Sequence, residues 1–343
     1  MEVVGWDIGG VNTKVALVRD GRVLAAHSRP FELQRAPHEL PRLLTSLATN
    51  IAASSHAPHA VTMTAELSQM FTSKREGVAF VVDAVSSAFP NAVTWIYAVD
   101  GDFHTPVEAK LRPLRVAAAN WSATAEAVAN LIPNAILIDT GTTTTDIIPL
   151  SCGRPVPSGR TDPERLASGE LVYTGAVRTP VEAIVAAVPL AGGMAGVSAE
   201  GFALAADVHL WRGSIQPDDY SVAPPDGRPA TRESAGLRLA RVVCADREML
   251  DDGAITAIAD AVADAQIDQI ARALGRVRLR HPHLDTAVVA GTGEFLAAAA
   301  ARAAGLTVLS LSTTFGPEAA RSAPAASVAF LLEKRLCTPP VSA

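Results

Sequence analysis

Asp-Ile-Gly-Gly-Val-Asn-Thr-Lys occupies residues 7–14, and a related stretch, Asp-Thr-Gly-Thr-Thr-Thr-Thr-Asp, occupies residues 139–146. In both stretches a Gly follows the Asp after two positions and a Thr follows it after six. Residues typical of β-strands flank each stretch, so each predicts a hairpin with a tight, Gly-bearing turn. The turn amides can surround an anion, and the carboxylate can hold Mg²⁺ directly or through water. One such turn is common, but two at matching offsets predict two similar half-molecules that hold one phosphorylated ligand.

The composition is that of a globular protein with a substantial core. The chain has 343 residues, of which 49% are hydrophobic and 19% charged, and its length predicts two domains. The net charge of −6 argues against nonspecific nucleic-acid binding, which depends on clustered Lys and Arg. A small anionic ligand in a locally positive pocket remains compatible with that charge.

The cysteines and the apolar segments predict a cytoplasmic protein. Cys152, Cys244 and Cys337 are widely spaced, which indicates neither a zinc site nor a disulfide framework. The first residues show no basic segment of the kind that begins a secretory signal. The longest uncharged apolar stretch, 183–197, is interrupted by Pro and Gly and is too short to span a bilayer. We therefore expect no membrane partner.

The order of predicted elements indicates mixed sheets flanked by helices. The first half reads as β-β-β-α-β-α-β, and the second half contains the second hairpin followed by helices and strands. Residues 212–234 are polar and rich in proline, which is typical of an excursion loop or lid. Gly291 and Gly293 follow a predicted strand and precede a helix. They could form a third ligand-facing loop or could serve only close strand–helix packing.

These elements together resemble the actin, sugar kinase and heat-shock ATPase superfamily. A narrower resemblance is carried by the stretches 5–14, 63–67, 117–121, 139–149 and 169–180. In these stretches the chain resembles the tetrahydromethanopterin-linked one-carbon-transfer pathway proteins, which are related to hydantoinases and oxoprolinases. The resemblance covers nearly the whole chain, and the block 169–180 is specific to this family.

The resemblance implies an α/β fold of the two-lobed actin-like ATPase (ribonuclease H-like) type, with the ligand cleft between the lobes. Lobe I would span 1–119 and carry the first hairpin. Lobe II would span 120–324 and carry the second hairpin, the glycine loop and the insertion 212–234. Residues 325–343 would form a helix that crosses back to lobe I.

Methanogen members of this family include the synthase of the methanofuran pathway. That enzyme joins an aminomethylfuran-methyl diphosphate to the phenol of γ-glutamyltyramine and releases diphosphate. By this resemblance, the hairpins would hold the diphosphate of a furan substrate, and the partners would be that diphosphate and a phenolic acceptor. The acceptor could be γ-glutamyltyramine, tyrosine or a polyglutamylated variant.

Under this implied chemistry, Asp7 and Asp139 are the candidate Mg²⁺ ligands and, with Lys14 and Glu66, the candidate catalytic residues. Glu66 could deprotonate the phenol or could cap the next segment. Arg178 could bind a glutamyl carboxylate or form a surface salt bridge. Lys14 could instead face solvent. The candidate diphosphate-binding residues are Gly9, Gly10, Asn12, Thr13, Lys14, Thr140, Gly141, Thr142, Thr143 and Thr144.

Two other functions fit the same pattern. An ATP-dependent small-molecule kinase or hydrolase is the ordinary activity of the superfamily, with ATP as cofactor. Here the third loop has only Gly291 and Gly293, followed by acidic Glu294, and this composition argues against ATP binding. A non-catalytic, nucleotide-gated binding protein is the other alternative. Because both Asp residues and Lys14 are intact, an enzyme is favoured.

Overall fold

Each quoted hairpin forms the centre of its own β-sheet. The computed structural model describes residues 1–316 and 320–337. The first hairpin joins β1 (Glu2–Ile8) to β2 (Asn12–Arg19), and the second joins β7 (Ala135–Thr140) to β8 (Thr145–Ser151). The apolar residues of these strands are fully buried, because helices or neighbouring segments cover both faces of each sheet.

The first sheet has six strands in the order β3-β2-β1-β4-β5-β6. Strands β1, β4 and β5 are parallel, whereas β2, β3 and β6 run antiparallel to their neighbours. The other strands of this sheet are β3 (Arg22–Pro30), β4 (His59–Met63), β5 (Thr94–Tyr97) and β6 (Phe103–His104).

The second sheet has the order β10-β8-β7-β13-β14, with β9 paired to β8. Strands β7, β13 and β14 are parallel, as their counterparts are in the first sheet. Its other strands are β9 (Arg154–Pro155), β10 (Leu171–Val172), β13 (Thr286–Ala290) and β14 (Thr307–Ser310). Both sheets are therefore mixed, as the sequence predicted.

Helices cover the first sheet because their apolar residues recur at helical spacing. In α1 (Leu40–Asn50), Leu40, Leu43, Leu44 and Leu47 are buried on one face. The Ser73 side chain caps α2 (Lys74–Ala88) by accepting from the Glu76 amide. The remaining helices of this lobe are α3 (Pro106–Leu111), α4 (Pro113–Val116) and the 3-10 turns Leu33–Arg35, Pro37–Glu39 and Ala65–Leu67.

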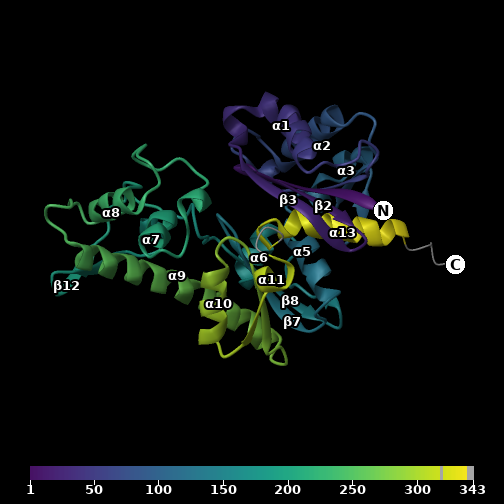
Figure 1. Ribbon diagram of the computed structural model, residues 1–343. Helices are drawn as coiled ribbons and strands as arrows, with labels where there is room; N and C mark the ends of the chain where they lie inside the picture. Colours follow the sequence, from purple (N-terminus) through teal and green to yellow (C-terminus); the bar gives the residue numbers. More distant parts are fainter. Residues whose placement is uncertain (317–319, 338–343) are drawn as a thin grey trace.

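Two helices rich in small residues, α5 (Asn120–Ala129) and α13 (Ala323–Cys337), pack against each other between the sheets. Figure 1 shows α13, in yellow, lying against the strands of the upper lobe. The approach is close, because a Cβ on Gly5 of β1 would lie 1.9 Å from the Ala325 carbonyl oxygen. Helix α13 begins two residues before the predicted C-terminal segment 325–343. Residues 338–343 of that predicted segment lie outside the described residues.

The second lobe is completed by α6 (Asp162–Ser168), α9 (Asp252–Arg280), α10 (Glu294–Ala303) and α11 (Leu311–Phe315). Helix α9 is long and extends beyond the sheet, to the left in Figure 1. Its far half shares a separate apolar core with α7 (Ala205–Trp211), α8 (Arg232–Arg241), the 3-10 turn Val181–Ala183 and β11 (Ala187–Leu190). Strand β12 (Gly193–Gly196) pairs with β11, and a further 3-10 turn spans Pro217–Asp219.

The predicted insertion 212–234 is anchored to this extension by a buried polar network. The Tyr220 hydroxyl donates to the Asp207 carboxylate, and Arg238 donates to Asp207 at 2.7 Å and to Asp226 at 2.9 Å. All four side chains are largely buried, and the Arg238 guanidinium pairs with both carboxylates. The segment is therefore a packed part of a larger structure, and α8 already begins at Arg232.

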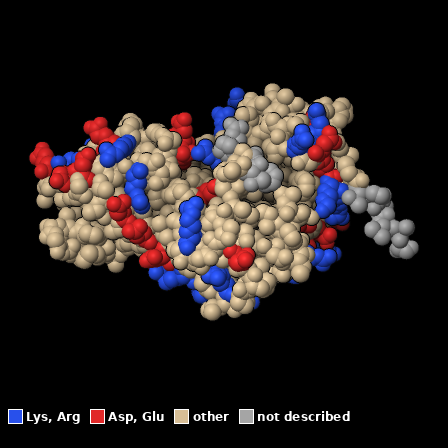
Figure 2. All heavy atoms as spheres, turned by 60° about the horizontal axis from the view of Figure 1, so that its bottom comes forward, with Lys and Arg blue, Asp and Glu red and all other residues tan. Residues whose placement is uncertain are grey.

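One face of the surface carries charges of both signs. In the view of Figure 2, Lys and Arg lie interspersed with Asp and Glu. Within 1–316 and 320–337, no helix is long and apolar enough to cross a membrane.

Candidate active site

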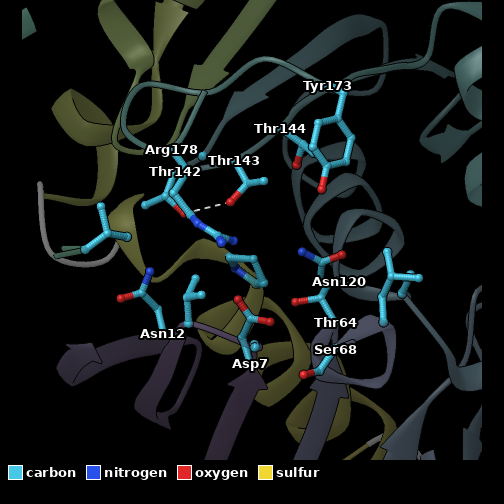
Figure 3. A pocket seen from close by; sticks show the side chains of 18 of the residues that line it. Asp7, Asn12, Thr64, Ser68, Asn120, Thr142, Thr143, Thr144, Tyr173 and Arg178 are labelled. Carbon is cyan, nitrogen blue, oxygen red and sulfur yellow. Dashed lines mark hydrogen bonds between the residues drawn. The ribbon is translucent and has the colours of Figure 1, made fainter. Parts of the chain in front are cut away.

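A cavity of about 690 Å³ lies where the two hairpins face each other. The turns of both hairpins line it, and so do side chains from β1, β7 and the segment before α5. In Figure 3, Asp7, Thr64 and Ser68 stand on one side, and Thr142, Thr143 and Arg178 stand opposite them. The cavity is thus bounded by both lobes, so a ligand in it would contact both.

The two turns have the same geometry. The Gly9 amide donates to the Asn12 carbonyl at 2.9 Å, and the Gly141 amide donates to the Thr144 carbonyl at 2.9 Å. The repeat seen in the sequence is therefore a repeat in three dimensions. Thr13 and Thr140, at the ends of the flanking strands, are fully buried behind the turns and do not line the cavity.

A separate segment supports each turn by binding its carbonyl groups. In the first turn, the Gly10 and Val11 carbonyls accept from the amides of Leu33 and Phe31. In the second, the Gly141 and Thr142 carbonyls accept from the amides of 176–178. Among the described residues, the turn amides of Gly10, Val11, Thr142 and Thr143 donate to no protein group. Both turns therefore offer free N–H groups, the arrangement that an anion requires.

The charged residues at the base of the hairpins face each other in register. Asp7 pairs across its hairpin with Lys14, and Asp139 pairs across its own with Asp146. The Lys14 ammonium lies 3.3 Å from Asp7 Oδ2. Asp146 is bound instead by Arg165, at 2.5 Å. The first hairpin thus contributes one cation and one carboxylate, and the second contributes two carboxylates.

Burial makes this carboxylate group electrostatically costly. Burial, followed by the charge of Asp146, raises the pKa of Asp139 to about 7. Burial also raises the pKa of Asp146, and the Arg165 guanidinium opposes that change. The Asp7 carboxylate is 5% exposed, and its Oδ1 has no hydrogen-bond donor among the described residues.

These observations fit a divalent cation that a phosphate group also ligates. Mg²⁺ is commonly held by one or two carboxylates, with substrate phosphates and water completing its shell. The unpartnered Asp7 oxygen and the buried Asp139 carboxylate could supply such ligands. No group of three or more acidic, His or Cys side chains among the described residues forms a closed metal site.

Glu66, the predicted base, does not line the cavity. It lies in the 3-10 turn after β4, where its Cα is 2.5 Å from the position of a Cβ on Gly77, so the turn packs tightly on α2. Its Oε1 is 3.7 Å from the Lys74 ammonium, which also bonds Asp162 at 2.8 Å. Glu66 is 2% exposed, and its carboxyl group is buried away from the cavity lining.

The Glu66→Gln protein is expected to lose less stability at high pH than the wild type does. Burial raises the pKa of Glu66 from 4.5 to about 7. The stability linked to this group is therefore present below about pH 4.5 and lost as pH rises through 7. Because Gln cannot ionise, Glu66→Gln does not lose this stability. From pH 5 to pH 8, its free energy of unfolding should therefore rise by about 2–3 kcal/mol relative to that of the wild type. Urea unfolding of both proteins at the two pH values measures it; a constant difference would contradict the account.

The third loop supports the second hairpin from behind and does not line the cavity. The Gly293 amide donates to the Thr140 carbonyl at 2.8 Å. A Cβ on Gly291, whose φ is +90°, would lie 2.3 Å from that same oxygen. Glu294, which follows Gly293, accepts from the hydroxyls of Ser310 and Ser312. These contacts support close strand–helix packing, which is one of the two roles predicted for the glycine pair.

Arg178 lines the cavity with an exposed side chain. Its backbone amide donates to the Thr142 carbonyl at 2.9 Å, which fixes the residue beside the second turn. Within the described part of the chain, its guanidinium forms no ion pair or hydrogen bond. The predicted alternative of a surface salt bridge therefore has no partner there, and the charge is available to an anionic ligand.

The structure adds cavity residues that the sequence did not single out. Arg165 is 1% exposed, stacks 4.2 Å from the Trp121 ring and holds Asp146. Asp146 could have been found, because it occupies the position in the second motif that Lys14 occupies in the first. Tyr173 lies in the stretch 169–180 that carries the family resemblance, but nothing in the sequence identifies Arg165 or Asp162 as cavity residues.

Comparisons with known proteins agree with this geometry. A family model described as Hydantoinase/oxoprolinase matches residues 58–335. A protein of Methanocaldococcus jannaschii named "(4-{4-[2-(gamma-L-glutamylamino)ethyl]phenoxymethyl}furan-2-yl)methanamine synthase" is 36% identical over 335 residues, covering 97% of this chain and 98% of the relative. A protein of the same name from Methanococcus vannielii is 32% identical over 211 residues, covering 60% of this chain and 94% of the relative.

Two solved structures are similar in fold. The nucleotide-free structure of acetone carboxylase matches with a TM-score of 0.59 and 12% identity, over 95% of this chain and 70% of that one. An ethanolamine utilization protein from Carboxydothermus hydrogenoformans matches with a TM-score of 0.51 and 14% identity, over 96% of this chain and 90% of that one. With the two mixed sheets and the crossing helices, these matches confirm the predicted two-lobed actin-like fold.

Proposed function

Because this chain belongs to the hydantoinase/oxoprolinase family, we propose that it condenses an aminomethylfuran-methyl diphosphate with a phenolic acceptor that carries a glutamyl group. The main support is the relative that is 36% identical along nearly the whole chain, whose name describes a furan joined to a phenol through a phenoxymethyl ether. The facing turns with free amides provide a second, independent support, since they suit a leaving diphosphate.

The proposed reaction exchanges one carbon–oxygen bond for another. The bond between the furan methylene carbon and the diphosphate breaks, and its electron pair leaves with the diphosphate. The furan ring stabilises the cation that develops on the methylene carbon. The phenol oxygen then bonds to that carbon, and its proton passes to a carboxylate of the cavity wall. Because Glu66 lies outside the cavity and Asp7 and Asp139 are assigned to Mg²⁺, the candidates are the other carboxylates that line it, Glu32, Asp146 and Asp162.

The task of the protein is to stabilise charge on the departing diphosphate. The amides of Gly10 and Val11 would bind it from lobe I, and those of Thr142 and Thr143 from lobe II. The Lys14 ammonium would add a positive charge at the base of the first hairpin. Asp7 and Asp139 would hold Mg²⁺, which when bound supplies Lewis-acid stabilisation of the leaving group.

The test of this function is a paired turnover assay with Mg²⁺. In one arm the protein receives the furan diphosphate and γ-glutamyltyramine, and both diphosphate and the aryl ether are measured. In the other arm it receives ATP with the furan alcohol or the phenol. We expect diphosphate and ether in equal amounts in the first arm only. ADP or phosphate formed from ATP, with no ether, would instead identify a kinase or hydrolase.

The Arg178→Ala protein is expected to bind the glutamyl acceptor less well. Its guanidinium would meet the α-carboxylate of the glutamyl group, a contact for which planar guanidinium is suited. The KM for γ-glutamyltyramine should rise about tenfold, whereas the KM for tyramine, which has no carboxylate, should stay within about twofold. Steady-state kinetics with both acceptors measure the effect. Equal changes for the two acceptors would show that Arg178 does not bind the carboxylate.

A further inference from the structure

A buried glutamine binds the segment that supports the second turn. Gln266 lies on α9, is fully buried and does not line the cavity. Its side-chain nitrogen donates to the Thr174 hydroxyl at 2.8 Å and to the Gly175 carbonyl at 3.1 Å. Thr174 and Gly175 directly precede the amides of 176–178, which bind the carbonyl groups of the turn. Gln266 therefore contacts the turn through one intervening segment.

The contact between Gly175 and the second turn is close. A Cβ on Gly175 would lie 2.5 Å from the Thr143 amide nitrogen, so no side chain separates the two backbones. The Ala176 amide, next along the segment, donates to the Gly141 carbonyl at 3.0 Å. A shift of the Gly175 backbone would thus move the turn and its free amides.

The orientation of the Gln266 amide follows from its neighbours. A carbonyl such as that of Gly175 can only accept, so the Gln266 nitrogen must face it and the Gln266 oxygen must point elsewhere. That oxygen lies 2.8 Å from Nε2 of His209, which is a residue of α7. Burial lowers the pKa of His209 to about 4, so the ring is neutral near pH 7. Its single proton is therefore on Nε2, which donates to Gln266.

This network is not the arrangement that stability alone would favour. Nδ1 of His209 is buried and has no hydrogen-bond partner within residues 1–316 and 320–337. A buried acceptor without a donor costs stability, whereas apolar side chains of similar shape would carry no such cost. The Gly175 carbonyl also accepts from the Thr179 hydroxyl at 3.3 Å, so Gln266 is not its sole donor. What the polar pair adds is direction, because hydrogen bonds fix where the Gly175 backbone lies.

We propose that Gln266 is a positioning residue for the second turn, and that His209 orients it. The inference rests on the proposed function, because it assigns this turn to a diphosphate. Gln266 holds the Gly175 backbone, and Gly175 in turn limits where Thr143 can lie. A displaced turn would leave the fold intact but weaken the bonds from its free amides, since hydrogen bonds depend on distance and angle. Helices α7 and α9 thereby contribute to the site without lining the cavity.

The test measures the binding of inorganic diphosphate with Mg²⁺ by isothermal titration calorimetry. Gln266→Met keeps the approximate shape of the side chain and removes its hydrogen bonds, so the affinity should fall about tenfold. Gln269→Met is the matched control, because Gln269 lies on the same helix and donates to the Ile184 carbonyl at 3.2 Å, outside the supporting segment. The control should keep its affinity within about twofold of the wild type.

Variants of His209 test the second contact. His209→Gln retains a side-chain N–H donor and should keep the affinity for diphosphate within about twofold, whereas His209→Phe removes the donor and should lower it about threefold. This pair decides the matter if Gln266→Met does not fold. In a folded Gln266→Met protein, an affinity within about twofold of the wild type would overturn the proposal, and so would an equal loss in Gln269→Met.

Hydrogen exchange gives a readout of the turn itself. In Gln266→Met the amides of 176–178, which bind the second turn, should exchange faster than in the wild type. The amides of Phe31 and Leu33, which bind the first turn, should exchange at the wild-type rate. Faster exchange at both turns would indicate a general loosening and would overturn the positioning role.

Turnover distinguishes this inference from the proposed function. In Gln266→Met the KM for the furan diphosphate should rise about tenfold, and the KM for the phenolic acceptor should stay within about twofold. If the wild type forms ether but diphosphate affinity does not depend on Gln266, the positioning role fails and the function stands. If no ether forms but diphosphate affinity does depend on Gln266, the function fails and the positioning role stands.

Discussion

The Asp7→Asn protein should release diphosphate from the furan substrate about a thousandfold more slowly than the wild type. Asp7 offers a buried oxygen without a hydrogen-bond donor among the described residues, and its other oxygen contacts Lys14 at 3.3 Å. The substitution removes a candidate Mg²⁺ ligand and the carboxylate that orients Lys14. Both losses fall on the stabilisation of the leaving group, where single interactions carry large rate effects. The measurement is kcat for diphosphate release at saturating Mg²⁺.

A matched control separates this effect from a general loss of acidic charge. Asp264 lies exposed on α9, outside the cavity, and Asp264→Asn makes the same chemical change there. Its rate should stay within about twofold of the wild type. Urea unfolding should give Asp7→Asn a stability within about 1 kcal/mol of the wild type, since the buried carboxylate is costly to the fold. A near-normal rate for Asp7→Asn would contradict the proposed role of the hairpin.

The Gly175→Ala protein should lose about a hundredfold in kcat/KM. A Cβ at this position would lie 2.5 Å from the Thr143 amide nitrogen and 2.6 Å from the Thr142 carbonyl carbon. The second turn would have to move away, and its free amides would no longer meet the diphosphate. The clash should also lower the free energy of unfolding by about 1–3 kcal/mol. Kinetics and urea unfolding measure the two effects.

Gly196→Ala is the control for this substitution. No atom lies within 4 Å of a Cβ built on Gly196, and its φ is not in the left-handed region. It should therefore leave both kcat/KM and stability nearly unchanged. If Gly175→Ala lowered stability but left kcat/KM at the wild-type value, the second turn would not bind the reacting group.

Local sequence was sufficient to predict the hairpins and their charged residues. A strand, a tight turn and a returning strand depend on neighbouring residues, so the matching offsets predicted two turns of the same geometry. The same locality placed Asp7, Lys14 and Asp139 at the bases of these turns, where the structure has them. The buried, parallel strands of both sheets were recognisable for the same reason.

Contacts between distant segments were beyond the sequence. Glu66 follows a strand that ends at the cleft, but its turn packs on Gly77 and directs the carboxyl group toward Lys74. Gly291 and Gly293 were recognised as a loop, but only their distance to Thr140 assigns them to packing. Arg165 reaches Asp146 from a short helix whose placement depends on the whole lobe.

The extension on α9 shows the same limit on a larger scale. The polar, proline-rich composition of 212–234 predicted a loop or lid, because segments of such composition are usually irregular and exposed to solvent. Residues 212–231 are mainly irregular, as a loop would be, and the buried pair of Asp207 and Arg238 holds them in place. The sequence did not predict this pairing, because it joins residues on two different helices. The structure also brings Val222 and Ala223 from this segment to the cavity wall.

The most direct test of the central claim is a crystal structure of the protein with Mg²⁺ and inorganic diphosphate. We expect one diphosphate between the two turns, accepting from the amides of Gly10 and Val11 on one side and of Thr142 and Thr143 on the other. Diphosphate bound to a single turn, or outside the cavity, would contradict the claim that the paired hairpins hold one diphosphate between the lobes.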